Sequence, residues 1–298
     1  MKKVKLSEGL SLSAVVQGFW RLDGWNWSAE ELARFMNECI ERGVTTFDTA
    51  EIYGDALCET LMGQAFEQDR SIRNKIQLVS KTGIFKEGGF GYYDTRYDRV
   101  KQSCEESLKR LHTDHLDLYL IHQPMGDYQG AYRAMEEAYQ KKELRAIGVC
   151  NFYPSRLADL CETVDVIPAV DPVELHPFFQ QEDAMALMKE YGVVPEAWGP
   201  FAEGKFGIFT HPVLTKIGSK YGKSAAQVAL RWNVQRGVVV IPKSVHKERI
   251  EQNLDIWDFQ LSQKDMEEIS GLDVGHSEIV SHDDPGFIKM LHGLKIHD

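Results

Sequence analysis

The sequence predicts an α/β fold of the (β/α)8 TIM-barrel type, and three observations lead to this prediction. Short apolar runs alternate with segments of helical periodicity along nearly the whole chain. About eight such units follow one another, and parallel strands joined by crossover helices can close into a barrel at that number. No linker rich in Pro, Gly or Ser divides the 298 residues. We therefore expect one barrel domain over residues 1–298, with an open doubly wound sheet as the alternative.

The expected strands are eight short apolar runs between helical segments. They begin near Ser13, Val44, Ile76, Leu116, Arg145, Ile167, Val193 and Val238. Two stretches, 82–98 and 199–212, interrupt the pattern and contain Gly and aromatic residues. Loops of this length are often functional, so we expect these two to lie over a pocket.

The expected helices carry recognisable start and stop signals. The apolar stripe of the first helix consists of Leu32, Phe35, Met36, Cys39 and Ile40. Their spacing follows the i, i+3, i+4, i+7 pattern of one helical face. Ser28 with Glu31 predicts a capping box before this stripe, and Gly43 predicts its end. Ser224 with Gln227 repeats the start signal near the end of the chain.

Composition limits the class of partner. Hydrophobic residues make up 43% of the chain and charged residues 27%, and the net charge is -11. This negative charge argues against nucleic acid and anionic membranes as partners, and no apolar run is long enough for a membrane span. The five cysteines are scattered and form no CxxC pair. We expect a cytoplasmic monomer that binds a small molecule and holds no metal.

Four ionisable residues follow apolar runs at the expected strand ends. Asp48 ends the second strand, Tyr53 lies in the next loop, Lys81 ends the third strand and His122 ends the fourth. Taken singly, each residue has a purely structural interpretation, such as a helix cap, rim packing or a hydrogen-bonded core histidine. In a barrel, however, the C-terminal ends of the strands form the working face. Together the four residues therefore predict a catalytic site.

Carbonyl reduction is the chemistry that these residues suit. A hydride reaches the carbonyl carbon, and a proton must reach the oxygen. Tyr53 can donate that proton, and a neighbouring Lys81 cation is expected to lower its pKa. Asp48 would hold Lys81 in place, and His122 would bind and orient the carbonyl oxygen of the substrate. The hydride requires a cofactor.

The cofactor signal lies after the eighth expected strand. There is no GxGxxG segment after the first strand, so a Rossmann-type site is not supported. The segment IPKSVHKERIEQN places Lys243 and Ser244 at a strand end, and a short helix is expected from about His246. The free N–H groups of such a helix can bind a phosphate, and Arg249 adds a bidentate donor. Two cations favour NADP(H) over NAD(H).

The chain resembles the aldo-keto reductase family through several separated motifs. These are FDTAEIYG, LVSKTG, SLKRLHTDHLDLYLIHQP, AIGVCNF, AWGPFAEGK and IPKSVHKERIEQN. The spacing of Asp48, Tyr53, Lys81 and His122 matches the catalytic tetrad of the family. The resemblance implies a (β/α)8 barrel that binds NADP(H) and reduces aldehydes or ketones.

The resemblance also implies roles for further residues. Trp198 would stack on the nicotinamide, Gly199 would follow the pyrophosphate, and Trp20 would line the substrate pocket. The residues around the adenosine 2′-phosphate would be Lys243, Ser244, Val245, His246 and Arg249. Gln252 and Asn253 would face the adenine.

Two positions depart from the family pattern at the nicotinamide. The family holds the carboxamide with Ser and Asn in a GVSNF segment and with Gln in a VNQ segment. Here Asn151 is kept, but Cys150 replaces the Ser and Pro172 replaces the Gln. Because a thiol is a weaker partner and proline cannot donate, we predict weaker nicotinamide anchoring.

The two halves of the chain resemble different bacterial branches of the family. The part from about Leu116 is similar to 2,5-diketogluconate reductases, which gives the hypothesis of a recombined or designed chain. A closely similar, uninterrupted genomic sequence would refute it. The segment after Leu272 is short, which predicts an open substrate pocket.

Two alternatives to the reductase remain at this point. One is a redox-sensing or regulatory barrel that binds NADP(H) with little turnover. The other is a barrel metal hydrolase, because His112, His115, His122 and His176 are available. Their spacing gives neither HxH nor HExxH, the patterns that zinc enzymes use.

Overall fold

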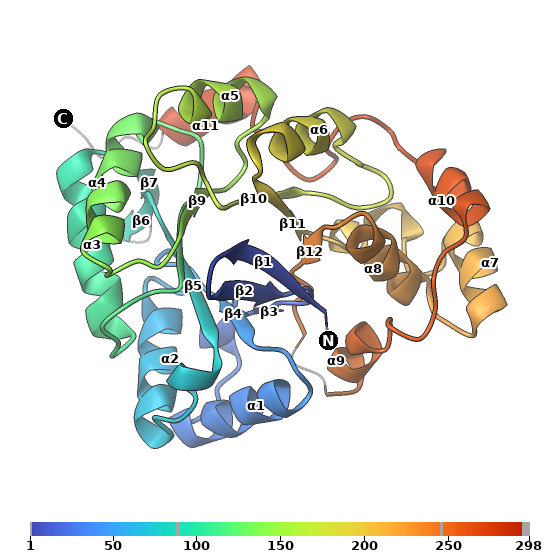
Figure 1. The fold of residues 1–298 in the computed structure, drawn as a ribbon, viewed down its shortest axis with the longest axis horizontal. Helices are drawn as coiled ribbons and strands as arrows, with labels where there is room; N and C mark the ends of the chain where they lie inside the picture. Colours follow the sequence, from blue (N-terminus) through green and yellow to red (C-terminus); the bar gives the residue numbers. More distant parts are fainter. Residues whose placement is uncertain (1, 88–89, 245–246, 294–298) are drawn as a thin grey trace.

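The computed structural model describes residues 2–87, 90–244 and 247–293, and their central feature is a ring of parallel strands (Figure 1). The strands of this ring are β3 (Gln17–Gly18), β4 (Thr46–Asp48), β5 (Gln77–Thr82), β8 (Leu118–Ile121), β9 (Ile147–Val149), β10 (Val170–Glu174), β11 (Val194–Trp198) and β12 (Val239–Val240). They form a five-stranded sheet, β3-β4-β5-β8-β9, and a three-stranded sheet, β10-β11-β12. Every strand pair within these sheets is parallel.

Backbone hydrogen bonds join the two sheets at both seams. Between β9 and β10, the Asn151 N–H donates to the Pro172 carbonyl oxygen at 2.8 Å. Between β12 and β3, the Val16 N–H donates to the Val240 carbonyl oxygen at 2.8 Å, and the Val240 N–H donates to Ala14 at 3.0 Å. The strands therefore close into a (β/α)8 barrel, and the alternative of an open doubly wound sheet is wrong.

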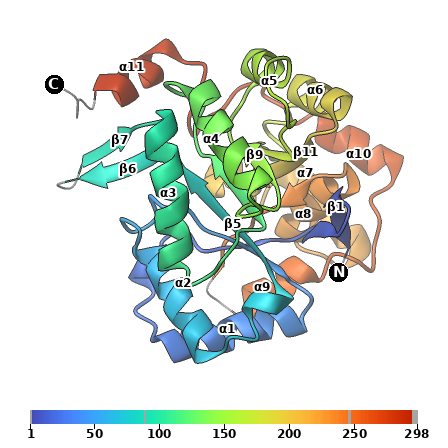
Figure 2. The ribbon, with the colours of Figure 1, turned by 60° about the vertical axis from the view of Figure 1, so that its left-hand side comes forward.

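Helices surround the barrel and connect its strands (Figures 1 and 2). They are α1 (Ala29–Glu41), α2 (Leu57–Gln68), α3 (Tyr97–Arg110), α4 (Tyr128–Gln140), α5 (Pro154–Cys161), α6 (Glu182–Tyr191), α7 (Pro212–Tyr221), α8 (Ala225–Gln235), α9 (Lys247–Leu254), α10 (Gln263–Ser270) and α11 (Pro285–Gly293). Short 3-10 turns lie at Leu22–Gly24, Arg73–Lys75 and Ala202–Gly207. The last of these falls within the expected loop 199–212.

The predicted helix signals are present in the structure. Ser28 and Glu31 form a reciprocal capping box at the start of α1, and Ser224 and Gln227 form one at the start of α8. Gly43 follows α1 with a φ of 84°, a backbone conformation that costs glycine little. The apolar face of α1 packs into the layer between helices and strands, which is the larger part of the core.

Two antiparallel hairpins extend the barrel beyond the expected pattern. The first pairs β1 (Lys3–Ser7) with β2 (Leu10–Ser13) and lies across the barrel centre in Figure 1. Leu10 and Leu12 are buried in a cluster with barrel residues such as Val79 and Leu118, so the hairpin closes one end of the barrel. The second pairs β6 (Ile84–Glu87) with β7 (Phe90–Tyr93) inside the segment 82–98, where we expected only a loop.

The C-terminal segment lies beside the second hairpin. Figure 2 shows α11 next to β6 and β7, and α11 contacts β7. The hairpin of β6 and β7 follows the C-terminal end of strand β5, and α11 lies on the same side of the barrel. In this position they can border a site at the C-terminal ends of the strands.

Candidate active site

Lys81 and Asp48 form a buried ion pair at the C-terminal ends of adjacent strands β5 and β4. The Lys81 Nζ lies 2.7 Å from Oδ1 and 2.6 Å from Oδ2 of Asp48, and the two side chains are 5% and 6% exposed. The Lys81 Nζ also donates to the Thr49 carbonyl oxygen at 2.9 Å and to the Tyr53 hydroxyl at 3.4 Å. Burial opposes the charge on Lys81, but Asp48 and Tyr53 outweigh it and raise the lysine pKa.

Tyr53 follows β4 in the loop before α2, and its hydroxyl faces the ammonium of Lys81. Burial raises the pKa of Tyr53 to about 12, while Lys81 acts in the opposite direction. Lys81 lowers the tyrosine pKa, as expected from the sequence, but burial is the larger effect and the net shift is upward. The free-energy cost of burying a phenolate away from water is larger than the stabilisation that the Lys81 charge gives it. At neutral pH the Tyr53 hydroxyl is therefore protonated, so it can act as a proton donor.

His122 follows β8 and lies edge-on to Tyr53, with ring centroids 5.8 Å apart and an interplanar angle of 76°. Burial, together with Lys81 and His282, lowers the pKa of His122 well below its ordinary value. The ring is therefore neutral at pH 7 and carries one N–H donor and one acceptor nitrogen. A neutral imidazole can donate to a carbonyl oxygen without competing for the proton of Tyr53.

A cavity of about 370 Å³ opens over these residues. It is lined by Gly18, Trp20, Asp48, Tyr53, Lys81, His122, Gln123, Cys150, Asn151, Pro172, Trp198, Gly199, Glu203, Ile241, Lys243, Val280, His282 and Phe287. The structure thus brings all four expected catalytic residues to one cavity. Trp20, which we expected at the substrate, is 43% exposed at this cavity.

Asn151 and Trp198 are joined by a hydrogen bond on another side of the cavity. The Trp198 Nε1 donates to the Asn151 Oδ1 at 2.7 Å, and the Asn151 Nδ2 donates to the His122 carbonyl oxygen at 3.2 Å. Asn151 adopts a φ of 62°, a conformation that asparagine tolerates better than most residues. Cys150 and Pro172 line the cavity beside them, and burial raises the pKa of the Cys150 thiol well above its ordinary value.

The expected phosphate-binding residues lie where β12 passes into α9. Lys243 lines the cavity, and its Nζ is 6.0 Å from the centroid of the Trp20 ring. Arg249 is exposed in the first turns of α9, and neither cation is paired with a carboxylate of a described residue. Unpaired cations next to a helix N-terminus fit the phosphate of a dinucleotide.

The remaining expected cofactor residues are distributed around the same region. Ser244 is buried, and its carbonyl oxygen accepts a hydrogen bond from Gln17 at 3.3 Å. Gln252 is exposed on α9, whereas Asn253 is buried. Val245 and His246 lie outside the described residues. Gly199 lines the cavity with a φ of 59°.

Several cavity residues were not found from the sequence. Gln123 follows His122 directly, and Val280, His282 and Phe287 come from the C-terminal segment. We expected the short tail to leave the pocket open, but the tail supplies part of its wall. The only sequence signal was the mixture of His and Phe with Pro and Gly in HDDPGFIKM.

The other histidines considered as metal ligands lie apart from the cavity and pair with acidic groups. His112 contacts Glu67, His115 contacts Asp114, and His176 contacts Glu174. Among the described residues, no group of three or more His, Cys, Asp or Glu side chains could hold a metal ion. Across residues 2–87, 90–244 and 247–293, no helix combines the length and apolar character that crossing a membrane requires.

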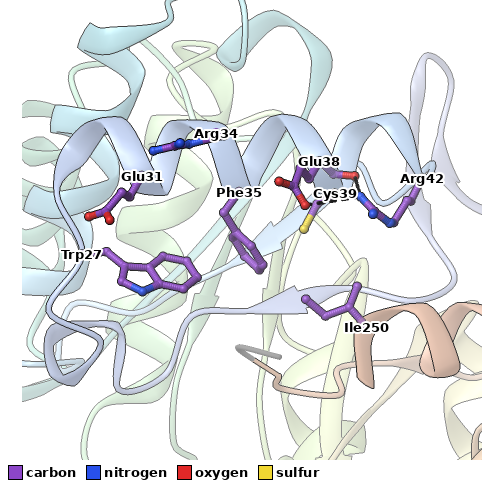
Figure 3. Close-up of a pocket in the computed structure, with 8 residues that line it drawn as sticks. All are labelled: Trp27, Glu31, Arg34, Phe35, Glu38, Cys39, Arg42 and Ile250. Atoms are coloured by element: carbon purple, nitrogen blue, oxygen red, sulfur yellow. Dashed lines mark hydrogen bonds and ion pairs between the residues drawn. The ribbon is translucent and has the colours of Figure 1, made fainter. Parts of the chain in front are cut away.

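A second hollow, of about 410 Å³, lies beside α1 and extends to Ile250 of α9 (Figure 3). It is lined by Trp27, Glu31, Arg34, Phe35, Glu38, Cys39, Arg42 and Ile250. Glu31 is engaged in the capping box, and Arg42 contacts Glu38 at 3.7 Å and Glu251 at 3.1 Å. Burial raises the pKa of Cys39 to about 12, so its thiol is unreactive at neutral pH. The residues that line this hollow include no Tyr, Lys or His that could transfer a proton to a substrate.

A barrel with a Tyr–Lys–Asp–His constellation at its strand ends belongs to the class of oxidoreductases. The sequence matches the Aldo/keto reductase family over residues 14–274, and the chain belongs to this family. It is 37% identical over 270 residues to the glyoxal reductase of Bacillus subtilis, covering 90% of this chain and 92% of that protein. It is 33% identical to the methylglyoxal reductase of Escherichia coli O157:H7, covering 91% and 94%.

Solved structures that resemble this chain are aldo-keto reductases as well. An aldo/keto reductase from Brucella melitensis superposes with a TM-score of 0.78 at 33% identity, over 91% of this chain and 99% of that chain. An aldo-keto reductase of Bombyx mori, solved in complex with NADP, superposes with a TM-score of 0.79 at 28% identity, over 92% and 94%. The (β/α)8 fold and the resemblance to aldo-keto reductases are thereby confirmed, and NADP(H) is the cofactor that the family uses.

Proposed function

We propose that this protein reduces aldehydes or ketones to alcohols with NADPH and that Tyr53 is the proton donor. The observation that carries the proposal is the contact of the Tyr53 hydroxyl with the buried Lys81–Asp48 pair, at 3.4 Å from the Lys81 Nζ. A protein that only binds the cofactor has no need for such a proton-transfer group. This argues against the regulatory barrel with little turnover.

The residues divide the work of the reaction. His122 donates to the carbonyl oxygen and orients it toward Tyr53, whose O–H then supplies the proton. When bound, NADPH supplies the hydride that the carbonyl carbon accepts. Lys81 stabilises the phenolate left on Tyr53 until solvent returns a proton, and Asp48 keeps Lys81 charged and in place.

The cofactor-binding residues of the proposal follow from the family resemblance, and the positions of the described ones support it. Lys243, Ser244 and Arg249, with Val245 and His246, would hold the 2′-phosphate, and the cations account for NADP(H) over NAD(H). Trp198 and Asn151 would hold the nicotinamide, Gly199 would follow the pyrophosphate, and Gln252 and Asn253 would face the adenine. Trp20 and His122 would contact the substrate.

Tyr53→Phe tests the proposal because it removes the hydroxyl and keeps the ring. We expect kcat for aldehyde-dependent NADPH oxidation, followed at 340 nm, to fall by about 100-fold or more. The dissociation constant of NADPH, measured by fluorescence titration, should stay within about twofold of the wild-type value. A variant that retains its kcat would overturn the assignment of Tyr53.

We also propose that the whole chain acts as one domain, as a cytoplasmic monomer without nucleic-acid or membrane partners. The negative net charge and the scattered cysteines, all five of them buried, support this. Sedimentation analysis that gives a mass near 34.0 kDa is the expected result, and a dimer would contradict it.

A further inference from the structure

The barrel cavity contains polar atoms that the reduction step does not use. His282 lines the cavity and is 1% exposed, and within the described residues neither of its ring nitrogens has a hydrogen-bond partner. The Oε1 of Gln123 lines the same cavity and is likewise buried without a partner in the described part of the chain. A buried polar atom without a partner costs about 1–3 kcal/mol, so a ligand that satisfies it gains affinity.

Aromatic neighbours hold the imidazole of His282 but offer it no hydrogen bond. Its ring centroid lies 5.8 Å from Tyr153 and 5.6 Å from Phe287, in both cases edge to face. Trp198, which we place at the nicotinamide, is 6.5 Å away. The backbone is fixed as well, because the His282 carbonyl oxygen accepts from the Arg156 Nη1 at 3.3 Å. A rigid frame thus holds the imidazole in the wall of the cavity.

The charge state of the imidazole narrows the kind of group it can bind. Burial, assisted by Arg156, lowers the pKa of His282 to about 4, so the ring is neutral at pH 7. A neutral imidazole has one donor and one acceptor, and the Gln123 Oε1 is an acceptor. A hydroxyl group accepts from the one and donates to the other. A carboxylate only accepts and would leave the Gln123 oxygen unmatched.

We propose that His282 and Gln123 form a polar subsite for a hydroxyl group on the carbonyl substrate. The substrates of choice are then hydroxyaldehydes or hydroxyketones rather than their unsubstituted analogues. Gln123 directly follows His122, the residue that orients the carbonyl oxygen, so the hydroxyl lies close to the reacting carbonyl. This inference rests on the proposed function, since it names the substrate class of the same site.

The test compares two aldehydes that differ by one hydroxyl, propanal and lactaldehyde. In His282→Phe the ring packing against Tyr153 and Phe287 is kept and the nitrogens are lost. We expect the kcat/KM ratio of lactaldehyde to propanal to fall about three- to tenfold, the effect of one lost hydrogen bond. Gln123→Leu should lower the ratio similarly, and His282→Asn should retain part of the preference.

His276→Phe is the matched control. His276 belongs to the same C-terminal segment, but it is exposed and bonded to Val274 and Glu278. This variant should keep the wild-type ratio. An unchanged ratio in both His282→Phe and Gln123→Leu would overturn the subsite.

If the proposed function itself is wrong, the experiment gives a different result from the one expected when only the subsite is wrong. If wild-type protein oxidises NADPH with neither aldehyde, the reductase assignment is wrong. Calorimetric dissociation constants for the two aldehydes then decide on the subsite. A preference for lactaldehyde that disappears in His282→Phe supports it, and equal affinities in the wild type overturn it.

Discussion

Replacing Lys81 with methionine tests the energetic role of the ion pair beneath the active site. The substitution removes an ammonium that lies 2.6 Å from the Asp48 carboxylate and leaves that carboxylate buried without its counter-charge. Breaking one partner of a buried pair costs about 3–5 kcal/mol. We expect the midpoint of thermal unfolding to fall by roughly 6–10 °C for a chain of this size.

The same substitution should impair proton transfer. At the observed 3.4 Å, the attraction between Lys81 and a Tyr53 phenolate is about 5 kcal/mol at an effective dielectric constant of 20. The transition state carries only part of that charge, so a reduction of kcat by about 100- to 1000-fold is expected. Single-turnover NADPH oxidation at saturating aldehyde measures this step directly.

The double variant Asp48→Asn/Lys81→Met separates stability from catalysis. It removes both charges, and so leaves no buried charge without a partner. We expect its unfolding free energy to return to within about 1 kcal/mol of the wild type, while kcat stays as low as in Lys81→Met. Recovery of activity in the double variant would refute the role of the Lys81 cation. An unaltered melting temperature in Lys81→Met would refute the energetic argument.

Three further predictions concern the cofactor, pH and packing. Pro172→Gln restores a side-chain donor at the nicotinamide and should tighten NADPH binding about three- to tenfold in a fluorescence titration; no tightening would refute weaker anchoring. Burial raises the pKa of Glu196 to about 8. The contribution of this side chain to the stability of the fold is therefore fully present below its ordinary pKa of 4.5, and it is lost as the pH rises through 8 and the buried carboxyl group ionises. Glu196→Gln should therefore reduce the difference in melting temperature between pH 5 and pH 9, and an undiminished difference argues against a protonated Glu196. Gly63→Ala places a Cβ against the Arg110 carbonyl oxygen and should cost about 1–3 kcal/mol in chemical denaturation, whereas Gly24→Ala, with open space around it, should not.

The barrel could be predicted because its signals are local. Apolar runs bounded by capping boxes and glycines repeat often enough that small errors in strand ends do not change the topology. The hairpin of β1 and β2 was missed although polar and apolar residues alternate in KVKLS and LSLS, with Gly9 between the two strands. The hairpin of β6 and β7 was missed although two glycines separate two aromatic segments, a recognised turn signal.

The active site was predictable only in part, for a physical reason. Residues at strand ends share one face of the barrel, so Asp48, Tyr53, Lys81 and His122 could be grouped from topology alone. His282 reaches the cavity through a C-terminal segment whose path no local pattern determines. The lowering effect of Lys81 on the pKa of Tyr53 could be predicted from the sequence, but the depth of burial could not, and here burial is the larger effect.

Asn151 links the proton-transfer side of the cavity to the side proposed for the nicotinamide. Its carboxamide oxygen holds the Trp198 indole, and its nitrogen holds the backbone of His122. With a thiol at Cys150 and no donor at Pro172, we predict that direct anchoring of the nicotinamide is reduced in this chain. A Trp198 ring already fixed by a hydrogen bond loses little rotational freedom when a ligand stacks on it, which offsets part of that reduction. From the bond between Asn151 and Trp198 we therefore predict that pre-organisation, rather than additional hydrogen bonds, positions the cofactor ring in this family member.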